Sequence, residues 1–214
     1  MSNARFFHSN SVRAPVKLYL ASSNPGKLTE YRALTQTFAS DYEIELELLP
    51  QFATLPAFDE SAPTFAENAA GKTIHYSRFH DGFVFADDSG LVVPALGGAP
   101  GVHSARYAGP HATSLERNAK LLAAVRGKSA AERQAHFVCA IALAEHGRTR
   151  AVVTARVDGE ILEAPRGAAG FGYDPVFYFP PLGKAFAEIP AAQKNQYSHR
   201  GQAFRKLLSF LAPL

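Results

Sequence analysis

The chain has 214 residues, of which 47% are hydrophobic and 19% charged, and it carries a formal net charge of +3. This composition supports one globular domain with its own core and excludes a disordered or fibrous chain. The charge is mild and the basic residues are scattered, which argues against a nucleic-acid partner and favours a small anionic ligand.

The single cysteine and the lengths of the apolar runs bear on the compartment. Cys139 lies in the run HFVCAIALA, so the chain can form no intramolecular disulfide, and the thiol is expected to be buried. No apolar run approaches the roughly 18 residues of a membrane span, and residues 1–15 lack the apolar centre of a signal peptide. We therefore expect a cytoplasmic protein with no membrane partner, in which residues 1–15 form a loose extension.

A first strand is predicted over residues 16–21 (VKLYLA), followed by the polar turn SSNPGK and a helix over residues 25–38. Pro25 suits the first helical turn, and Ser23 or Asn24 can cap it. Unpaired N–H groups at this helix start, with Lys27 beside them, would bind phosphate. The spacing differs from the GxxxxGK[ST] phosphate loop, and a capped helix with an incidental lysine is the alternative.

Residues 42–49 alternate acidic and apolar side chains and predict a half-exposed strand, and residues 64–79 predict a second helix. Thr64 is the expected cap, with Glu67 completing a capping box. A role for Glu67 in binding a metal ion is the alternative, and Glu60 in the preceding loop competes for that role.

An apolar run at residues 83–85 leads into Asp87, Asp88 and a Ser-Gly pair, which predicts a strand that ends in a turn. Adjacent carboxylates at the end of a strand repel each other, so a hard divalent cation is a natural partner. A solvated turn without a ligand is the alternative interpretation.

The second half of the chain predicts a helix over residues 113–125, a hairpin of strands at 135–144 and 149–157, and a final helix that begins after Ser198. Residues 167–180 are rich in glycine and aromatic side chains, which could pack in the core or stack on a flat heterocycle. Lys194, His199 and Arg200 gather near the last helix start, where cations are unfavourable unless an anion is present. This clustering indicates a site.

The order of these motifs is more specific than any one of them. SSNPGK, TFAENAAGK, FADDSGLVVPALGGAPGVHSARYAG, FGYDP and SHR together resemble the house-cleaning purine nucleoside triphosphate pyrophosphatases, over residues 16–210. That family removes inosine and xanthosine triphosphates. Its first motif reads TGNxGK, and Ser22 and Ser23 stand here in place of its Thr and Gly.

The resemblance implies a single elongated α/β domain over residues 16–214, with a curved mixed sheet flanked by helices and a nucleotide cleft between two lobes. It implies a homodimer, Mg²⁺, and hydrolysis of inosine, deoxyinosine and xanthosine triphosphates to the monophosphate and pyrophosphate. Asp88 would be the catalytic residue and a metal ligand, helped by Glu60 or Glu67, with Asp87 as a further candidate. The implied substrate-binding residues are Ser22, Ser23, Asn24, Pro25, Gly26, Lys27, Ser89, Phe171, Gly172, Tyr173, Asp174, Lys194, His199 and Arg200.

Base selection would follow from donors and acceptors. Hypoxanthine and xanthine carry a carbonyl oxygen where adenine carries an amino group, and Arg200 has only donors. Phe171 would stack on the base, Asp174 would accept from a ring N–H or order the pocket, and Lys194 would hold the base or a phosphate. A non-catalytic nucleotide-binding module, or a pyrophosphatase for dUTP or methylated pyrimidine nucleotides, are the alternatives.

Overall fold

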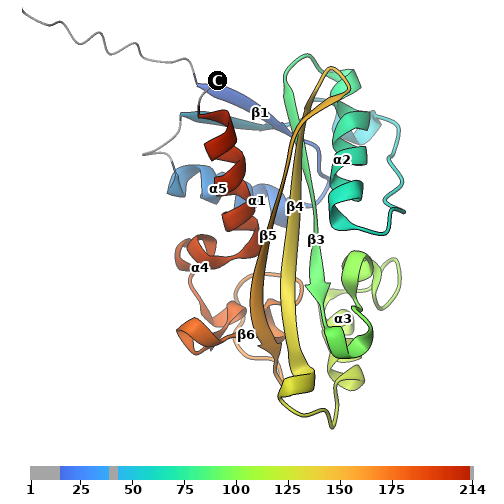
Figure 1. The fold of residues 1–214 in the computed structure, drawn as a ribbon, viewed down its shortest axis with the longest axis vertical. Helices are drawn as coiled ribbons and strands as arrows, with labels where there is room; N and C mark the ends of the chain where they lie inside the picture. Colours follow the sequence, from blue (N-terminus) through green and yellow to red (C-terminus); the bar gives the residue numbers. More distant parts are fainter. Residues whose placement is uncertain (1–14, 39–42, 213–214) are drawn as a thin grey trace, which may run out of the picture.

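The computed structural model describes residues 15–38 and 43–212, so residues 1–14 of the expected extension lie outside the described part. A seven-stranded mixed sheet forms the centre of these residues, in the order β2-β1-β3-β4-β5-β6-β7 (Figure 1). β1 is parallel to β2 and β3, and every later pairing is antiparallel. The strands are β1 (Val16–Leu20), β2 (Ile44–Leu48), β3 (Phe83–Val92), β4 (Gln134–Glu145), β5 (Arg148–Ile161), β6 (Phe177–Phe179) and β7 (Lys184–Ala185).

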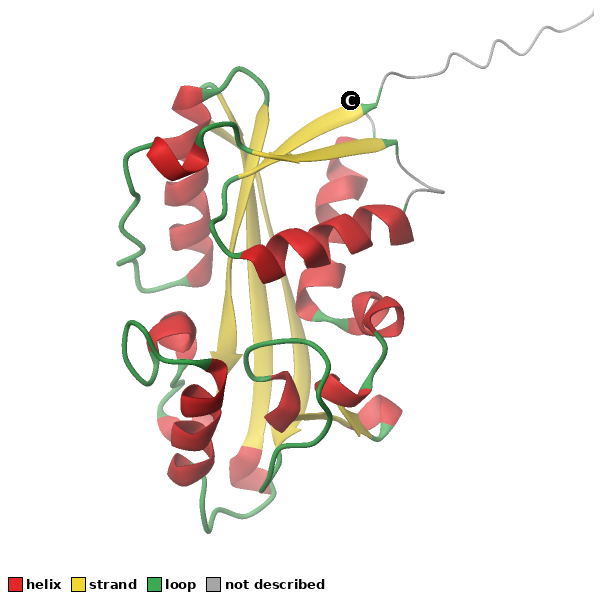
Figure 2. Ribbon diagram, turned by 180° about the vertical axis from the view of Figure 1, so that it is seen from behind, coloured by secondary structure: helices red, strands yellow, loops and turns green. Residues whose placement is uncertain are grey.

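Helices cover both faces of this sheet (Figures 1 and 2). They are α1 (Pro25–Thr37), α2 (Phe65–Tyr76), α3 (Ser114–Ala124), α4 (Ala191–Tyr197) and α5 (His199–Leu211). Short 3₁₀ turns join them: η1 (Phe52–Thr54), η2 (Ser77–Phe79), η3 (Pro94–Leu96), η4 (Gly101–Arg106), η5 (Ala131–Arg133), η6 (Asp174–Val176), η7 (Pro180–Leu182) and η8 (Phe186–Glu188). This confirms the predicted α/β class with a mixed sheet flanked by helices, and the two-lobe arrangement stays a prediction.

Two apolar layers fix the helices on the sheet. On one face, Tyr31 of α1 packs edge-on against Phe85 of β3 and Phe204 of α5, with ring centroids 5.1 and 5.2 Å apart. On the other face, Ala69 of α2 packs against Ala140 and Ala142 of β4. Small residues at this second contact let α2 approach the sheet closely, so polar residues of α2 can reach β3.

The predicted helix starts are confirmed. Asn24 caps α1 by accepting from the N–H groups of Gly26 and Lys27, with Pro25 in the first turn. Ser198 caps α5 by accepting from the Gly201 N–H. These caps satisfy helix-terminal donors locally, which is why the sequence pattern alone could locate them.

The prediction that β3 ends at Asp87 and turns at Ser89 and Gly90 is wrong. β3 continues to Val92 because β4 pairs with it residue by residue, from Val84 opposite Ala144 to Val92 opposite His136. Gly90 is required for close approach, since a Cβ there would lie 2.3 Å from Ser104 Oγ of η4.

This continuation changes where the paired carboxylates point. Successive residues of a strand face opposite sides of a sheet, so Asp87 faces α1 and α5 while Asp88 faces α2. β1 ends at Leu20, opposite Phe85, and among the described residues no strand pairs with β3 on that side from Ala86 to Leu91. Asp87 and Asp88 therefore lie on an open sheet edge.

Candidate active site

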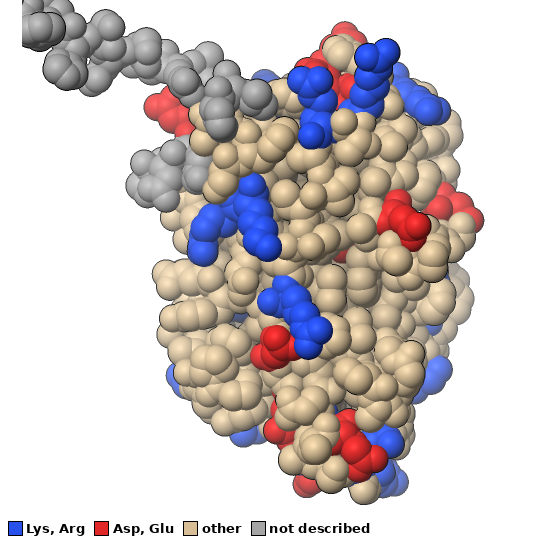
Figure 3. Space-filling view, viewed as in Figure 1, with Lys and Arg blue, Asp and Glu red and all other residues tan. Residues whose placement is uncertain are grey.

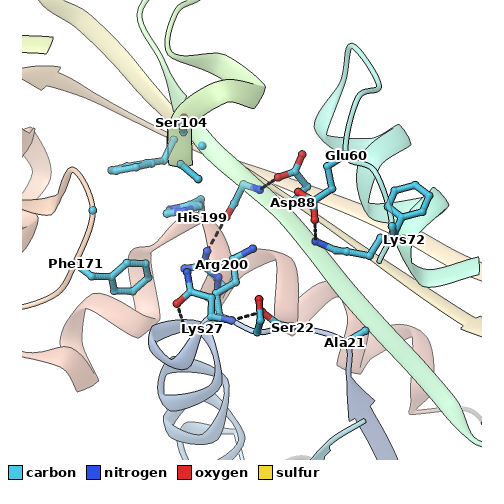
Figure 4. Close-up of a pocket in the computed structure, with 18 of the residues that line it drawn as sticks. Ala21, Ser22, Lys27, Glu60, Lys72, Asp88, Ser104, Phe171, His199 and Arg200 are labelled. Atoms are coloured by element: carbon cyan, nitrogen blue, oxygen red, sulfur yellow. Dashed lines mark hydrogen bonds and ion pairs between the residues drawn. The ribbon is translucent and has the colours of Figure 1, made fainter. Parts of the chain in front are cut away.

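A pocket of about 700 Å³ opens along this edge of β3, and Figure 4 shows its labelled side chains. The structure brings together most residues predicted from the sequence, while Pro25, Gly26, Glu67 and Asp87 are absent from the lining. The predicted residues that line it are Ser22, Ser23, Asn24, Lys27, Glu60, Asp88, Ser89, Phe171, Gly172, Tyr173, Asp174, Lys194, His199 and Arg200.

Asp87 is buried behind the pocket as a counter-ion. Lys27 Nζ lies 3.0 Å from its Oδ1, and Arg200 donates to its Oδ2 through Nε and Nη2, both at 3.3 Å. Burial alone would raise the pKa of Asp87, but the charges of Lys27, Arg200 and Lys72 hold it well below the usual range. A carboxylate committed to two cations in the interior has no place for a metal ion, which argues against the metal role considered for Asp87.

Asp88 is the carboxylate that faces the pocket, with 7% of its surface exposed. Asn68 Nδ2 donates to its Oδ2 at 3.0 Å, and the Ser89 N–H donates to its Oδ1 at 2.9 Å. Burial, and then the nearby charge of Glu60, raise the pKa of the Asp88 carboxyl. A carboxylate with a raised pKa and a free lone pair on each oxygen is suited to accept a proton or to bind a cation.

Glu60 and Asp88 fit a divalent cation as a pair. Their mutual repulsion is the charge pattern that a cation relieves, and Mg²⁺ typically takes one or two carboxylates together with waters and phosphate oxygens. Among the described residues no group of three or more His, Cys, Asp or Glu side chains gathers in a metal-binding arrangement. Glu67 is exposed at the start of α2, where Thr64 Oγ1 donates to it at 2.7 Å and accepts from its N–H.

Two lysines flank the open edge of β3. Lys27 Nζ and Lys72 Nζ both donate to the main-chain carbonyl oxygen of Asp87, at 3.1 and 2.9 Å. Lys72 also contacts Glu60 Oε1 at 2.5 Å. Lys72 was not predicted as a site residue, although Asn68 and Lys72 are polar residues one helical turn apart on a helix face that otherwise packs on the sheet.

The opposite end of the pocket is aromatic. Phe171 is 37% exposed, with Lys194 Nζ 5.2 Å and Arg200 Cζ 5.6 Å from its ring centroid. Asp174 Oδ2 accepts from the Phe171 N–H at 2.9 Å and from Lys194 Nζ at 2.5 Å. Burial raises the pKa of Asp174, against the opposing effect of Lys194. An open ring face beside donors and a buried carboxyl can hold a flat heterocycle.

The cluster of Lys194, His199 and Arg200 is compensated within the protein, which corrects the premise that it lacks an anion. Arg200, only 3% exposed, donates from Nη1 to Glu30 Oε2 at 2.6 Å and from Nη2 to Ser89 Oγ at 2.7 Å. Burial, Arg200 and Lys194 lower the pKa of His199 well below its ordinary value, so its ring is uncharged at neutral pH. Glu30 was not predicted as part of the site, because its partner lies 170 residues away and the sequence around Glu30 carries no local signal.

The parts of the pocket are separated in space, with basic side chains between an aromatic end and an end that carries carboxylates. In Figure 4 Phe171 lies at one side, Glu60, Lys72 and Asp88 at the other, and Lys27 and Arg200 between them. Basic side chains elsewhere form small separate groups on the face that Figure 3 shows. The fold and this pocket define an α/β protein with an open sheet edge, whose pocket has carboxylate, basic and aromatic parts suited to an anionic ligand that carries a flat ring.

Comparison with known proteins identifies the family. The sequence model described as the Ham1 family matches residues 18–210. A protein of Geobacillus kaustophilus named dITP/XTP pyrophosphatase is 50% identical over 191 residues, which is 89% of this chain and 92% of that protein. A protein of the same name from Gloeobacter violaceus is 48% identical over 192 residues, 90% of this chain and 92% of its own.

A solved structure agrees with the sequence comparisons. A HAM1 protein from Coxiella burnetii is 40% identical and superimposes with a TM-score of 0.82, over 93% of this chain and 100% of that one. The chain therefore belongs to the Ham1 family, and the resemblance inferred from its motifs is confirmed. No helix in the described parts of the chain is long and apolar enough to cross a membrane.

Proposed function

We propose that this protein hydrolyses deaminated purine nucleoside triphosphates, those of inosine, deoxyinosine and xanthosine, to the nucleoside monophosphate and pyrophosphate. The observation that carries the proposal is Asp88, a pocket-facing carboxylate with a raised pKa beside two lysines and across the pocket from an exposed aromatic ring. Relatives at 50% and 48% identity over most of the chain bear the name dITP/XTP pyrophosphatase.

The two ends of the pocket suggest how a triphosphate lies in it. The base stacks on Phe171, and the phosphates extend toward Lys27 and Lys72, which offer positive charge along the β3 edge. Asp88 accepts a proton from a water molecule that attacks the α-phosphorus. The bond from this phosphorus to the bridging oxygen breaks, so pyrophosphate leaves with the electron pair while the lysines offset its growing charge.

Asp88 and Glu60 are the residues that we propose for Mg²⁺, and we leave Glu67 out because it is exposed beyond the pocket lining. When bound, Mg²⁺ supplies neutralising charge for the triphosphate oxygens. The paired negative charges of Asp88 and Glu60, which repel each other in the protein alone, are the observation that supports this assignment.

Base selection rests on the donor-rich end of the pocket. The carbonyl oxygen at position 6 of hypoxanthine or xanthine accepts from Arg200. Adenine has an amino group there, which is a donor and would face the donors of Arg200. Leaving one such buried group unpaired costs about 1 to 3 kcal/mol. Asp174, which already accepts from the Phe171 N–H, can accept a ring N–H of the base or hold Lys194 in place.

Pyrophosphate release from inosine, deoxyuridine and adenosine triphosphates, each with and without Mg²⁺, tests the proposal. We expect rapid release from inosine triphosphate only, and only with the metal. Release from deoxyuridine triphosphate alone would indicate a different pyrophosphatase. Tight nucleotide binding without release from any of them would indicate a binding module.

The oligomeric state and the compartment complete the proposal. We propose that the protein acts as a homodimer and in the cytoplasm, as the family resemblance implies. The buried thiol of Cys139 is compatible with a reducing compartment. Light scattering after gel filtration measures the assembly, and a mass of one chain would contradict the dimer.

A further inference from the structure

Asn68 of α2 contacts both Asp88 and the loop that carries Glu60, the two carboxylates proposed for the metal. The residue is buried, with 1% of its surface exposed, and it lies one helical turn before Lys72. Every polar hydrogen of its amide is used, because Nδ2 donates to Asp88 Oδ2 at 3.0 Å and to the carbonyl oxygen of Ala62 at 3.2 Å.

The orientation of this amide is determined by the main chain. Asn68 Oδ1 accepts from the Ala62 N–H at 2.9 Å, and a main-chain N–H can only donate. The oxygen must therefore face Ala62, and the NH₂ group must face Asp88. A flipped amide would leave the Ala62 N–H facing a donor and Asp88 facing an oxygen.

These contacts tie together two segments that are far apart in the sequence. Asp88 belongs to β3, while Ala62 belongs to the loop that carries Glu60 two residues earlier. With the Ser89 N–H on Oδ1 and Asn68 on Oδ2, the Asp88 carboxylate has one donor on each oxygen and cannot rotate freely. Lys72, on the same helix face, contacts Glu60 directly.

We propose that Asn68 is a positioning residue that sets the orientation of Asp88 and its spacing from Glu60 for a divalent cation. This inference rests on the proposed hydrolysis at Asp88 and adds a residue that does not line the pocket. Because Asn68 does not line the pocket, we expect it to touch neither substrate nor metal. It acts through the carboxylate on one side and through the loop on the other.

Three variants separate this role from simple stability. Asn68→Ala removes the contacts to both segments. Asn68→Asp has the same shape and keeps an acceptor for the Ala62 N–H, but it places an oxygen against Asp88 Oδ2. Thr73→Val is the matched control, since Thr73 is a buried polar residue of the same helix whose hydroxyl donates to the Ala69 carbonyl oxygen at 2.7 Å and lies 3.3 Å from that of Ala142, away from Asp88.

The readouts are Mn²⁺ binding to the protein without nucleotide, by electron paramagnetic resonance, and kcat and KM for pyrophosphate release from inosine triphosphate. For Asn68→Ala we expect Mn²⁺ affinity and kcat each to fall by about tenfold or more, with KM changed by less than about threefold. The kcat of Asn68→Asp should fall by at least as much as that of Asn68→Ala. Thr73→Val should keep both values within about twofold of the wild type. Circular dichroism establishes that each variant is folded.

Three results would overturn the inference, and a fourth would affect only the proposed function. The inference is overturned if Asn68→Ala and Thr73→Val have the same Mn²⁺ affinity and the same kcat. It is also overturned if the wild-type protein binds no Mn²⁺. Asn68→Asp with wild-type kcat would mean that the loop contact alone matters and that Asp88 is not positioned by Asn68. If the wild type releases no pyrophosphate, the proposed function fails, while the comparison of Mn²⁺ affinities still decides the role of Asn68.

Discussion

Arg200 and Glu30 form a buried ion pair, with Arg200 Nη1 2.6 Å from Glu30 Oε2, between helices at opposite ends of the chain. Arg200 also contacts Asp87, so one guanidinium is shared by two buried carboxylates, and Lys27 supplies a second cation to Asp87. Removing it leaves both acids without that partner in the interior, and an uncompensated buried charge is strongly destabilising.

Arg200→Ala should therefore lower the free energy of unfolding by about 3 to 5 kcal/mol. Glu30→Gln, which keeps the shape and one acceptor, should cost less. Urea unfolding at pH 7 followed by circular dichroism measures both. Equal costs for the two variants would show that the charge of Arg200 is not what stabilises this contact.

The local patterns of the sequence were sufficient for the helices, their caps and the placing of Lys27, because a cap and a helix start are decided within a few residues. Local patterns could not predict where β3 ends, because its continuation depends on pairing with β4, about fifty residues later in the chain. The same limit explains Glu30 and Asn68. Each is an ordinary polar residue of a helix until the fold brings Arg200 or Asp88 to it.

Asp88 is expected to matter for turnover and not for nucleotide binding. Asp88→Asn keeps the shape of the side chain but removes the proton acceptor and one charge of the proposed metal pair, so kcat should fall by at least about a hundredfold. Binding of inosine monophosphate, measured by calorimetry, should change little because Phe171 lies at the other end of the pocket. Near-normal kcat in this variant would contradict the catalytic assignment.

Lys27 should discriminate triphosphate from monophosphate. Lys27→Ala removes a cation from the β3 edge, so the affinity for inosine triphosphate, measured in the Asp88→Asn background to prevent turnover, should fall by about tenfold. The affinity for the monophosphate should fall less. Equal losses for both ligands would mean that Lys27 supports Asp87 or contacts only the phosphate that they share.

His199 should make stability depend on pH. Its pKa is lowered by burial in the folded protein and is near 6.5 in the unfolded chain, so below that pH only the unfolded chain takes up the proton. Stability should therefore fall as the pH drops from 7.5 to 5.5, by about 1 kcal/mol from this group. His199→Asn should remove that part of the slope in urea unfolding. An unchanged slope in the variant would assign the pH dependence to other groups.

The selectivity for the base is the sharpest test of Arg200. If its guanidinium donates to the carbonyl at position 6, Arg200→Ala removes a contact to hypoxanthine and, together with it, the donor that disfavours adenine. The ratio of kcat/KM for inosine over adenosine triphosphate should then fall by at least about tenfold, which corresponds to about 1.4 kcal/mol. The destabilisation expected for this variant reduces the amount of folded protein equally for both substrates, so it cannot change the ratio. Glu30→Gln provides the control, because it perturbs the same buried contact while the guanidinium stays. A ratio unchanged in Arg200→Ala would assign base recognition to the Phe171, Asp174 and Lys194 end of the pocket and leave Arg200 with its ion pairs.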